Sequence, residues 1–586
     1  MRQNMHDGFP HDRSRYTTAS APGPSRWYGA VVVALAAVLF LTRLGARALW
    51  ASEGRWAEVV REMQLSSNYF WPTINGALYY DKPLLSYWFI VAATHVTGGL
   101  NEAATRLPSA VFGLAGVILM IVMARRLYDR ATAAWAGFIL ATSFSYVFFA
   151  RHASADVETT TGVLAALTLF VWHREHRGGW WIVLLWLIMA ATALTKGLQG
   201  FALPLVVIGL YSLLAEGGQF GQLTHGSVSQ KFSWLRRRCW WFFNPMTPIA
   251  LIAAGALYYL PFAISSHRSH SEAGLYLVFR ENVVRFFEPF DHRGPIYMYL
   301  YVIFGLMAPW SVFIPAALLE VHHKVRRAAT SALADADVFA LIYFWGTLAF
   351  FTLSRSRRSY YLLPILPAAA LVVARLLSGY ASELWAPARR LMKVGYGALA
   401  AVTIIGGVAF LLPPAMRVGW LRMLPPSPAR LIFLAGWLIA IGTVFYALGR
   451  LSVRRIAISS GVIAYLVLFF LFVVAMPKAE QYRYERSFAR TVRSTIDGTP
   501  GQLALYRIWG PGLVYYLSMP HPIPAFADPD RLADFVESKG GAWVITREKD
   551  VDNVKLQHEV LAGEPVLPWD SASETRSRYV LLRVHQ

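Results

Sequence analysis

The sequence predicts an all-α protein that crosses a membrane many times and ends in a small α/β domain. Hydrophobic residues make up 56% of the 586 positions, and the mean hydropathy is +0.41. Charged residues make up 15%, whereas a soluble globular chain carries about 25%. Many apolar runs approach the roughly 20 residues that a helix needs to cross the hydrocarbon core. Together these features indicate a polytopic helical membrane protein.

The orientation follows from basic clusters that come after alternate apolar runs. Positively charged loops are retained on the cytoplasmic side of a membrane. Residues 1–26 are polar and basic, so we expect a cytoplasmic tail before an uncleaved first span. The clusters that we place on the cytoplasmic side are Arg125/Arg126/Arg130, Arg174/Arg177, Arg236/Arg237/Arg238, Lys324/Arg326/Arg327, Arg389/Arg390/Lys393 and Arg450/Arg454/Arg455.

The same clusters decide the interpretation of residues 83–98, which look apolar enough to span. If this segment crossed the membrane, every later basic cluster would lie on the outer side, against the charge rule. The segment is also short and follows Asp81 and Lys82. We therefore expect a helix in the outer interface rather than a span.

The apolar runs then predict about thirteen transmembrane helices within residues 27–476, with the larger periplasmic loops at 45–104 and 265–295. The N-terminus is expected inside the cell and the C-terminus outside. The spans are expected at residues 27–44, 105–123, 131–149, 158–173, 179–195, 198–214, 246–264, 296–320, 337–354, 359–377, 391–412, 430–448 and 455–475.

The composition changes near residue 477. Short apolar runs such as QLALYR and GAWVITR alternate with turn signals and with one helical stretch, DRLADFVESKG. This alternation is typical of a mixed α/β unit. We expect residues 477–586 to form a small periplasmic α/β domain.

Composition also limits the partners and cofactors. The net charge is +21, but most of the surplus lies in short loops, where membrane topology and anionic lipid headgroups account for it. We expect membrane lipids as partners and no nucleic acid. The single cysteine, Cys239, excludes an intramolecular disulfide. No cofactor is required, although His267 and His270 have a spacing that suits a divalent metal.

Basic residues on the expected outer side are the first candidates for a site. Lys82, Lys196 and the cluster Arg355, Arg357 and Arg358 lie in or beside outer turns. Unpaired charge at membrane depth is costly, and guanidinium groups match phosphate geometry well. These residues predict an anionic ligand. The alternative is pairing with neighbouring carboxylates or with lipid headgroups.

Carboxylates on the same side are the second set of candidates. Glu53 and Asp156 each follow the outer end of a span, where a carboxylate can bind an amine or assist proton transfer. The alternative for Glu53 is stabilisation of the N-terminus of a helix that follows it. The alternative for Asp156 is the N-cap of the fourth span.

The order of these motifs resembles the C-type (GT-C) membrane glycosyltransferases of the protein O-mannosyltransferase superfamily. Within it, the sequence is most similar to the bacterial lipid A 4-amino-4-deoxy-L-arabinose transferases. The resemblance covers about residues 27–380. It rests on residues 53–65, Asp81-Lys82-Pro83, Asp156, Thr195-Lys196-Gly197, Arg285-Phe286-Phe287 and residues 355–367.

The resemblance implies about a dozen spans, a cavity at the outer face and an undecaprenyl-phosphate-linked sugar donor. The acceptor would be lipid A or another envelope molecule, at the bacterial inner membrane. Glu53, Arg55, Lys82, Asp156 and Lys196 occupy matching motif positions. The sequence departs from the family where the first loop usually opens with two adjacent acids, because the first position is Ser52.

We assign provisional roles on this basis. Glu53, Asp156 and Lys82 are the catalytic candidates, and the candidates for the donor phosphate are Arg55, Lys82, Lys196, Arg355, Arg357 and Arg358. The remaining candidates for substrate contact are Tyr80, Asp81, Glu158, Arg280, Glu281 and Tyr360. Because Ser52 replaces an acid, either Glu53 or Asp156 acts as the base, or the acceptor is already ionised, such as a lipid A phosphate, and needs no base.

Two alternative functions stay open. One keeps the enzyme class but uses a hydroxyl of a protein or glycan as the acceptor. The other is a transporter of lipid-linked sugars. Transporters place ionisable residues near the middle of the bilayer and show inverted repeats, whereas this sequence concentrates its charges at one interface and shows no repeat.

Overall fold

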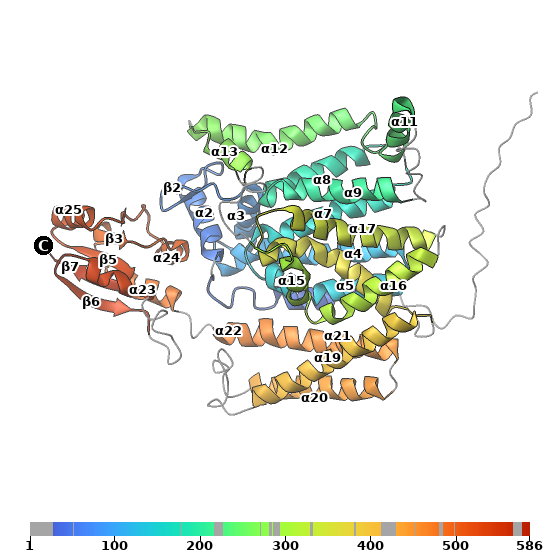
Figure 1. Cartoon of the computed structure of the whole chain (residues 1–586). Coiled ribbons are helices and arrows are strands. Elements are labelled where there is room, and N and C mark those ends of the chain that lie inside the picture. The colour runs from blue at the N-terminus through green and yellow to red at the C-terminus, as the bar shows by residue number, and fades with distance from the viewer. Residues whose placement is uncertain are drawn as a thin grey trace, which may run out of the picture.

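Long helices lying side by side form most of the molecule, and a separate sheet domain lies beyond one end of them (Figure 1). In the computed structural model, the helices of the first half are α1 (Trp27–Leu41), α4 (Glu102–Leu127), α5 (Arg130–Ala141), α7 (Ala155–His173), α8 (Trp181–Lys196), α9 (Gln199–Leu214) and α12 (Thr247–Ser269). Those of the second half are α16 (Ile314–Arg327), α17 (Ala332–Leu353), α18 (Leu366–Leu377), α19 (Ala386–Leu411), α20 (Ala429–Leu448) and α21 (Val453–Phe469). Shorter pieces in the bundle are α6 (Phe144–Ala150), α13 (Ala273–Phe279), α15 (Met298–Leu306) and α22 (Met476–Lys478).

The structure describes most of the chain. The described ranges are residues 27–50, 52–176, 179–215, 227–269, 271–280, 284, 294–327, 332–379, 383–411, 429–449, 452–479, 484–496, 499–565 and 577–585. The predicted cytoplasmic tail at 1–26 lies outside them.

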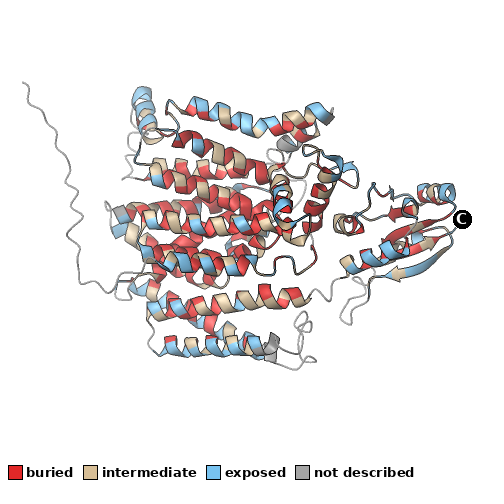
Figure 2. Ribbon diagram, turned by 180° about the vertical axis from the view of Figure 1, so that it is seen from behind, coloured by how far each residue is buried: buried red, intermediate tan, exposed pale blue. Residues whose placement is uncertain are grey.

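The composition of these helices fits a bilayer. Six of the described helices are long and apolar enough to cross a membrane singly: Glu102–Leu127, Thr247–Arg268, Leu333–Leu353, Ser359–Leu377, Ala386–Val408 and Val453–Lys478. Four shorter ones are also apolar: Trp27–Leu41, Trp181–Lys196, Gln199–Leu214 and Ile432–Leu448. Figure 2 shows the buried residues concentrated in the middle of the bundle and exposed ones on helices at its margins. Exposed apolar side chains such as Ile252 and Phe445 suit contact with lipid. The chain is a multi-pass membrane protein, while the number of thirteen spans stays a prediction.

Two predicted spans are not continuous helices. The expected span 131–149 consists of α5 and α6, which meet at an angle of 65°. At the break, the hydroxyls of Thr142 and Ser143 donate to the carbonyls of Phe138 and Ile139. Such side-chain bonds compete with the helical pattern. The expected span 296–320 is likewise divided into α15, a 3₁₀ turn at Trp310–Phe313, and α16, because Pro309 has no N–H to continue a helix.

A layer of short elements covers one end of the bundle. It contains α2 (Glu53–Ser66), the two-stranded hairpin of β1 (Thr73–Ile74) and β2 (Ala77–Leu78), and α3 (Leu85–Thr97). The predicted helix at 83–98 corresponds to α3. Its 13 residues rise only about 20 Å, which is less than the roughly 30 Å of a hydrocarbon core. A helix of this length does not cross a bilayer by itself.

The C-terminal domain is built around a mixed five-stranded sheet in the order β4-β3-β5-β7-β6. The strands are β3 (Leu503–Tyr506), β4 (Ala525–Phe526), β5 (Ala542–Arg547), β6 (His558–Gly563) and β7 (Tyr579–Val584). The parallel pairs β3–β4 and β3–β5 require crossover connections. These contain α24 (Pro511–Leu517) and α25 (Pro529–Lys539), and α23 (Glu485–Thr495) precedes the sheet. The predicted α/β character of this region is confirmed.

The C-terminal domain contacts the bundle mainly through α24, which lies against α2. The two helices approach so closely that a Cβ built on Gly54 would lie 2.4 Å from the Cα of Gly512. Polar contacts surround this point: Tyr516 accepts a hydrogen bond of 2.6 Å from the Leu49 N–H, and Asn75 forms two hydrogen bonds with the backbone of Ile523. The domain is therefore fixed to the helix whose first turn borders the site described below.

The contact between Gly54 and Gly512 gives a first prediction. Gly54→Ala is expected to lower the melting temperature of the detergent-purified protein, because overpacking costs about 1–3 kcal/mol. That cost exceeds the gain of about 1 kcal/mol from replacing a helical glycine with alanine. Gly209→Ala is the matched control, since its Cβ would meet no atom within 4 Å. A Gly54→Ala variant as stable as this control would contradict the prediction.

Candidate active site

A cavity of about 770 Å³ is lined in part by α2 and the loop before α3, and these elements lie at the end of the bundle that faces the C-terminal domain (Figure 1). Its lining comes from segments far apart in sequence: the start of α2, the loop before α3, the turn between α6 and α7, the junction of α8 and α9, and the end of α17 with the 3₁₀ turn at Ser359–Ile365. Its volume is within the range of small-molecule sites, about 300–1,000 Å³. Among the described residues, four cations and two carboxylates line it: Arg55, Lys82, Lys196, Arg358, Asp81 and Asp156.

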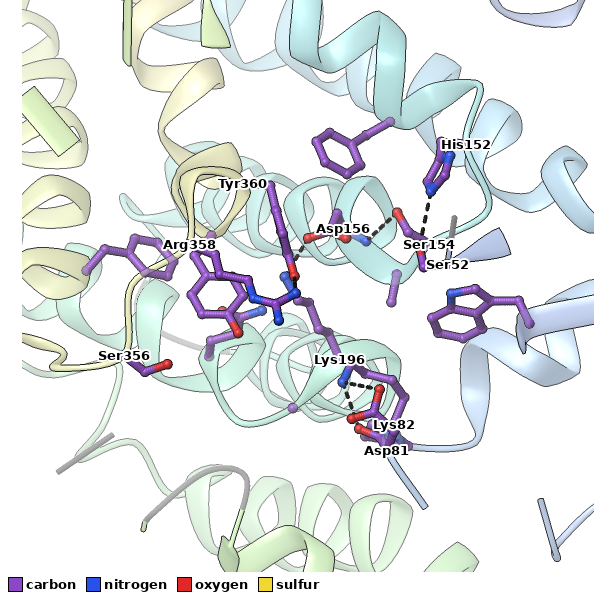
Figure 3. Close-up of a pocket in the computed structure, with 18 of the residues that line it drawn as sticks. Ser52, Asp81, Lys82, His152, Ser154, Asp156, Lys196, Ser356, Arg358 and Tyr360 are labelled. Atoms are coloured by element: carbon purple, nitrogen blue, oxygen red, sulfur yellow. Dashed lines mark hydrogen bonds and ion pairs between the residues drawn. The ribbon is translucent and has the colours of Figure 1, made fainter. Parts of the chain in front are cut away.

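One charged group is built by α2 and the loop before α3. Asp81 accepts from Arg55 at 3.0 Å and pairs with Lys82 at 3.0 Å, and Arg55 also donates to the hydroxyl of Tyr79 at 3.1 Å. Burial would raise the pKa of Asp81, but Lys82 and Arg55 outweigh it and hold that pKa below its ordinary value. The carboxylate therefore stays ionised and keeps both cations at the edge of the cavity (Figure 3).

A second charged pair forms between the start of α7 and the end of α8. Ser154 caps the N-terminus of α7, and Asp156 follows in its first turn. Lys196 lies in the last turn of α8. Both charges are favoured by the helix dipoles at these ends, and Lys196 Nζ lies 2.5 Å from Asp156 Oδ1. The expected alternative, Asp156 as the N-cap, is wrong because Ser154 occupies that position.

Two tyrosine rings lie beside Lys196, and one of them also contacts Arg358. Lys196 Nζ lies 5.1 Å and 4.8 Å from the ring centroids of Tyr360 and Tyr361, within the range of cation–π attraction. Arg358 donates to the hydroxyl of Tyr360 at 2.6 Å. Asp156, Lys196, Arg358 and Tyr360 thus face the cavity from one side, opposite Ser52 and His152 (Figure 3).

Only one residue of the predicted arginine cluster lines the cavity. Arg358 does so, whereas Arg355 is exposed and lies outside the lining. Arg357 donates to the backbone carbonyls of Gly294 and Thr352 at 2.7 and 2.8 Å. These contacts hold the chain in place before the 3₁₀ turn. They engage the Arg357 guanidinium, which we had predicted to bind the donor phosphate.

Glu53 is placed behind the cavity rather than in it. Its carboxylate is fully buried and accepts bonds of 2.7 and 2.8 Å from Arg106 of α4. It also accepts from the backbone N–H groups of Trp50 and Ala153. Burial alone would raise the pKa of Glu53, but His152, Arg106 and Arg47 lower it far below the ordinary value. Glu53 is therefore an ionised residue that holds the start of α2 against α4 and α7.

The other predicted contacts divide into buried, exposed and undescribed residues. The hydroxyl of Tyr80 donates a hydrogen bond to the carbonyl of Phe70. Glu158 is buried and accepts a hydrogen bond from the hydroxyl of Ser86. Neither lines the cavity, and neither does Arg280, which is exposed. Glu281 and the Arg285-Phe286-Phe287 motif lie outside the described residues.

The predicted metal pair stays a prediction. His267 is exposed near the end of α12, and His270 lies outside the described ranges. Within those ranges, no group of three or more His, Cys, Asp or Glu residues is arranged to hold a metal ion.

Several lining residues were not identified as site residues from the sequence. His152 lies in the lining and is 5% exposed, and Trp56 and Ser356 also contribute. The indole N–H of Trp56 and the hydroxyl of Ser356 are buried without a hydrogen-bond partner in the described structure. Buried polar groups are normally paired, so these two suit hydrogen bonds to a polar ligand. A tryptophan at the end of a helix in a membrane protein is usually an interfacial residue, so the sequence alone did not identify Trp56 as a site residue.

Comparisons with known proteins agree with this arrangement. Residues 81–224, which contain Asp81, Lys82, Asp156 and Lys196, match the family described as dolichyl-phosphate-mannose-protein mannosyltransferase. An uncharacterized protein of Aquifex aeolicus is 24% identical over 548 residues, or 92% of this chain and 93% of that protein. An undecaprenyl phosphate-alpha-4-amino-4-deoxy-L-arabinose arabinosyl transferase of Pseudomonas aeruginosa is 28% identical over 58% of each chain. The corresponding transferase 1 of Pseudomonas fluorescens is 26% identical over 66% of this chain and 64% of its own length.

The chain is therefore similar in sequence to polyprenyl-phosphate-dependent membrane glycosyltransferases. The predicted family resemblance is confirmed at this level, and the aligned part spans about six tenths of the two arabinosyl transferases.

The solved structures extend the likeness to the whole fold. ArnT from Cupriavidus metallidurans bound to undecaprenyl phosphate has a TM-score of 0.71 with this chain, at 20% identity over 96% of this chain and 98% of ArnT. The apo state of the same protein gives a TM-score of 0.70. The fold of this transferase family thus includes the helical bundle and the C-terminal sheet domain.

Proposed function

We propose that this chain transfers a sugar from undecaprenyl phosphate to lipid A at the periplasmic face of the bacterial inner membrane. The observation that carries the proposal is the cavity at one end of the bundle, with four cations in its lining. The first candidate for the sugar is 4-amino-4-deoxy-L-arabinose, because the arabinosyl transferases of Pseudomonas are named for that donor.

The cations fit the chemistry of the leaving group. When the bond between the sugar C1 and the phosphate oxygen breaks, negative charge grows on undecaprenyl phosphate. Fixed cations at that point stabilise the transition state more than the ground state. Lys82 and Arg55 are held together by Asp81, so their charges are positioned before the donor binds.

The remaining polar groups fit a sugar. Asp156 offers a second carboxylate oxygen beside its pair with Lys196, which can accept a hydrogen bond from a hydroxyl or an amine. The unpartnered groups of Trp56 and Ser356 supply a donor and a hydroxyl. The aromatic rings of Tyr360 and Tyr361 provide apolar surface next to them.

The acceptor atom has two candidates. A lipid A phosphate is ionised at neutral pH and can attack without a base, whereas a hydroxyl of lipid A, a glycan or a protein needs help to lose its proton. A phosphate acceptor agrees with the absence of an acid at Ser52. The hydroxyl acceptor is favoured by a different observation, the hydrogen bond between Ser52 and His152.

Mass spectrometry of lipids tests the proposal. Lipid A from cells that express the chain is expected to gain the mass of one amino sugar relative to cells without it. Purified protein is also expected to release undecaprenyl phosphate from an undecaprenyl-phosphate-linked sugar when lipid A is added. A transporter would move the intact donor between the leaflets of vesicles without cleaving it. That result, or an unchanged lipid A together with a modified glycan or protein, would contradict the proposal.

A further inference from the structure

Ser52, His152 and Glu53 lie next to one another in a line that ends at the cavity, with a hydrogen bond between Ser52 and His152 and an ion-pair contact, but no hydrogen bond, between His152 and Glu53. Ser52 Oγ lies 3.2 Å from His152 Nε2, and His152 Nδ1 lies 3.4 Å from Glu53 Oε1. Ser52 and His152 line the cavity, and Figure 3 shows the contact between them. A hydroxyl, an imidazole and a carboxylate in this order are the groups that nature uses to move a proton away from an attacking oxygen.

The surroundings fix which atoms carry protons. Glu53 is ionised and can only accept hydrogen bonds. His152 Nδ1 faces this carboxylate, so the tautomer with the proton on Nδ1 is favoured. The lone pair of Nε2 is then directed at Ser52, whose hydroxyl donates to it. The imidazole ring also stacks on Phe148, with centroids 5.2 Å apart and planes at 20°, which keeps Nε2 aimed at Ser52.

The ring is uncharged in the resting protein. Burial lowers the pKa of His152 to about 4. The charged groups that face it are Glu53 of α2 and Asp156 of α7, which raise its pKa, and Arg106 of α4 and Arg47 of the segment before α2, which lower it. At neutral pH the ring is therefore unprotonated and can accept a proton, and Glu53 lies beside it to stabilise the imidazolium that results.

We propose that Ser52 and His152 take the proton from an acceptor hydroxyl, with Glu53 as the positioning residue. This deepens the proposed function and rests on it, because it selects a hydroxyl as the attacking group.

The acceptor oxygen forms a bond to the sugar C1, and the bond from C1 to the phosphate oxygen breaks, with its electron pair leaving on undecaprenyl phosphate. The acceptor proton passes to Ser52 Oγ while the proton of Ser52 passes to His152 Nε2. The imidazolium later releases its proton to the departing phosphate or to water. A phosphate acceptor has no proton to remove and would leave this line of groups unused.

The product distinguishes the two acceptor atoms. Purified full-length protein is incubated with undecaprenyl phosphate carrying 4-amino-4-deoxy-L-arabinose and with either intact or enzymatically dephosphorylated lipid A. We expect transfer to dephosphorylated lipid A as well, and a product whose sugar survives mild acid. A sugar on phosphate is released by mild acid, whereas a sugar on a hydroxyl is an ordinary glycoside.

Variants test the relay itself. His152→Gln and Ser52→Ala are expected to lower kcat for the hydroxyl acceptor by about 10²–10⁴-fold, with the KM for the donor unchanged. Adding Ser52→Asp to His152→Gln is expected to restore part of kcat, because a carboxylate can accept the proton directly. A purely structural role for His152 would not predict this rescue. His323→Gln is the matched control, since His323 stacks on Trp385 outside the cavity lining.

The failures are distinguishable. Transfer only to intact lipid A, with an acid-labile product and no effect of His152→Gln or Ser52→Ala, would overturn the relay and leave the proposed function standing. No transfer to either acceptor by the unmodified protein would overturn the proposed function and the relay with it.

Discussion

Lys82→Met is expected to abolish sugar transfer while the protein still accumulates and folds. Methionine keeps the length of the side chain and removes the charge. Lys82 is 17% exposed at the cavity edge and is held by Asp81 at 3.0 Å. If it stabilises the departing phosphate, its loss should lower kcat by about 10²–10³-fold, as for other groups aimed at developing negative charge.

The measurement is turnover of an undecaprenyl-phosphate-linked sugar by purified protein, alongside the melting temperature. Lys324→Met is the matched control, because Lys324 pairs with Glu320 within α16 and does not line the cavity. Turnover by Lys82→Met within a factor of two of this control would remove Lys82 from the site.

Arg106→Met is expected to cause the largest loss of stability. Arg106 is fully buried and donates to Glu53 and to the carbonyls of Leu44, Arg47 and Ala48. Removing one partner of a buried ion pair leaves an uncompensated charge and costs about 3–5 kcal/mol. We expect a strongly lowered melting temperature and poor accumulation in membranes.

The double variant Arg106→Met with Glu53→Gln serves as its control. It should be more stable than Arg106→Met alone, since no ionised carboxylate is then left buried. An equal or lower stability of the double variant would show that the carbonyl contacts of Arg106, rather than Glu53, carry the effect.

The same ion pair predicts a pH dependence with a defined sign. The pKa of Glu53 is lowered in the folded protein from an ordinary value of 4.5. Its contribution is therefore present above pH 4.5 and is lost as the pH falls toward the folded value. The difference in melting temperature between the unmodified protein and Glu53→Gln should shrink as the pH is lowered below about 4.5.

Local sequence was sufficient to locate several groups that meet in the cavity. Lys82, Asp156 and Lys196 each lie at the border of an apolar run, where a charge is conspicuous, whereas Arg55 was identified only through the family resemblance. The distribution of positive charge among the loops then predicted which ends of the spans lie on the same side of the membrane. The interpretation of residues 83–98 as a helix too short to span depended on the same rule, and α3 has that length.

Other features depend on contacts between residues far apart in the chain. Arg106 binds Glu53 behind the cavity, and these two residues lie 53 positions apart in the sequence. The link from Ser52 to His152 joins positions 100 residues apart, which no spacing rule connects. The break in the span at 131–149 depends on Thr142, whose hydroxyl also accepts from the indole of Trp310. Prediction from periodicity alone treats such a segment as one helix.

The close contact between Gly54 and Gly512 links two parts that are distant in sequence. Gly54 lies between Glu53 and Arg55, so a shift of the C-terminal domain would move the backbone that carries both. The ring centroid of Trp509 in the domain also lies 6.0 Å from that of Tyr79, and the Tyr79 hydroxyl accepts a hydrogen bond from Arg55. The domain thus supports α2 from outside the cavity, and a chimaera that imports this domain from a relative would need α2 from the same relative.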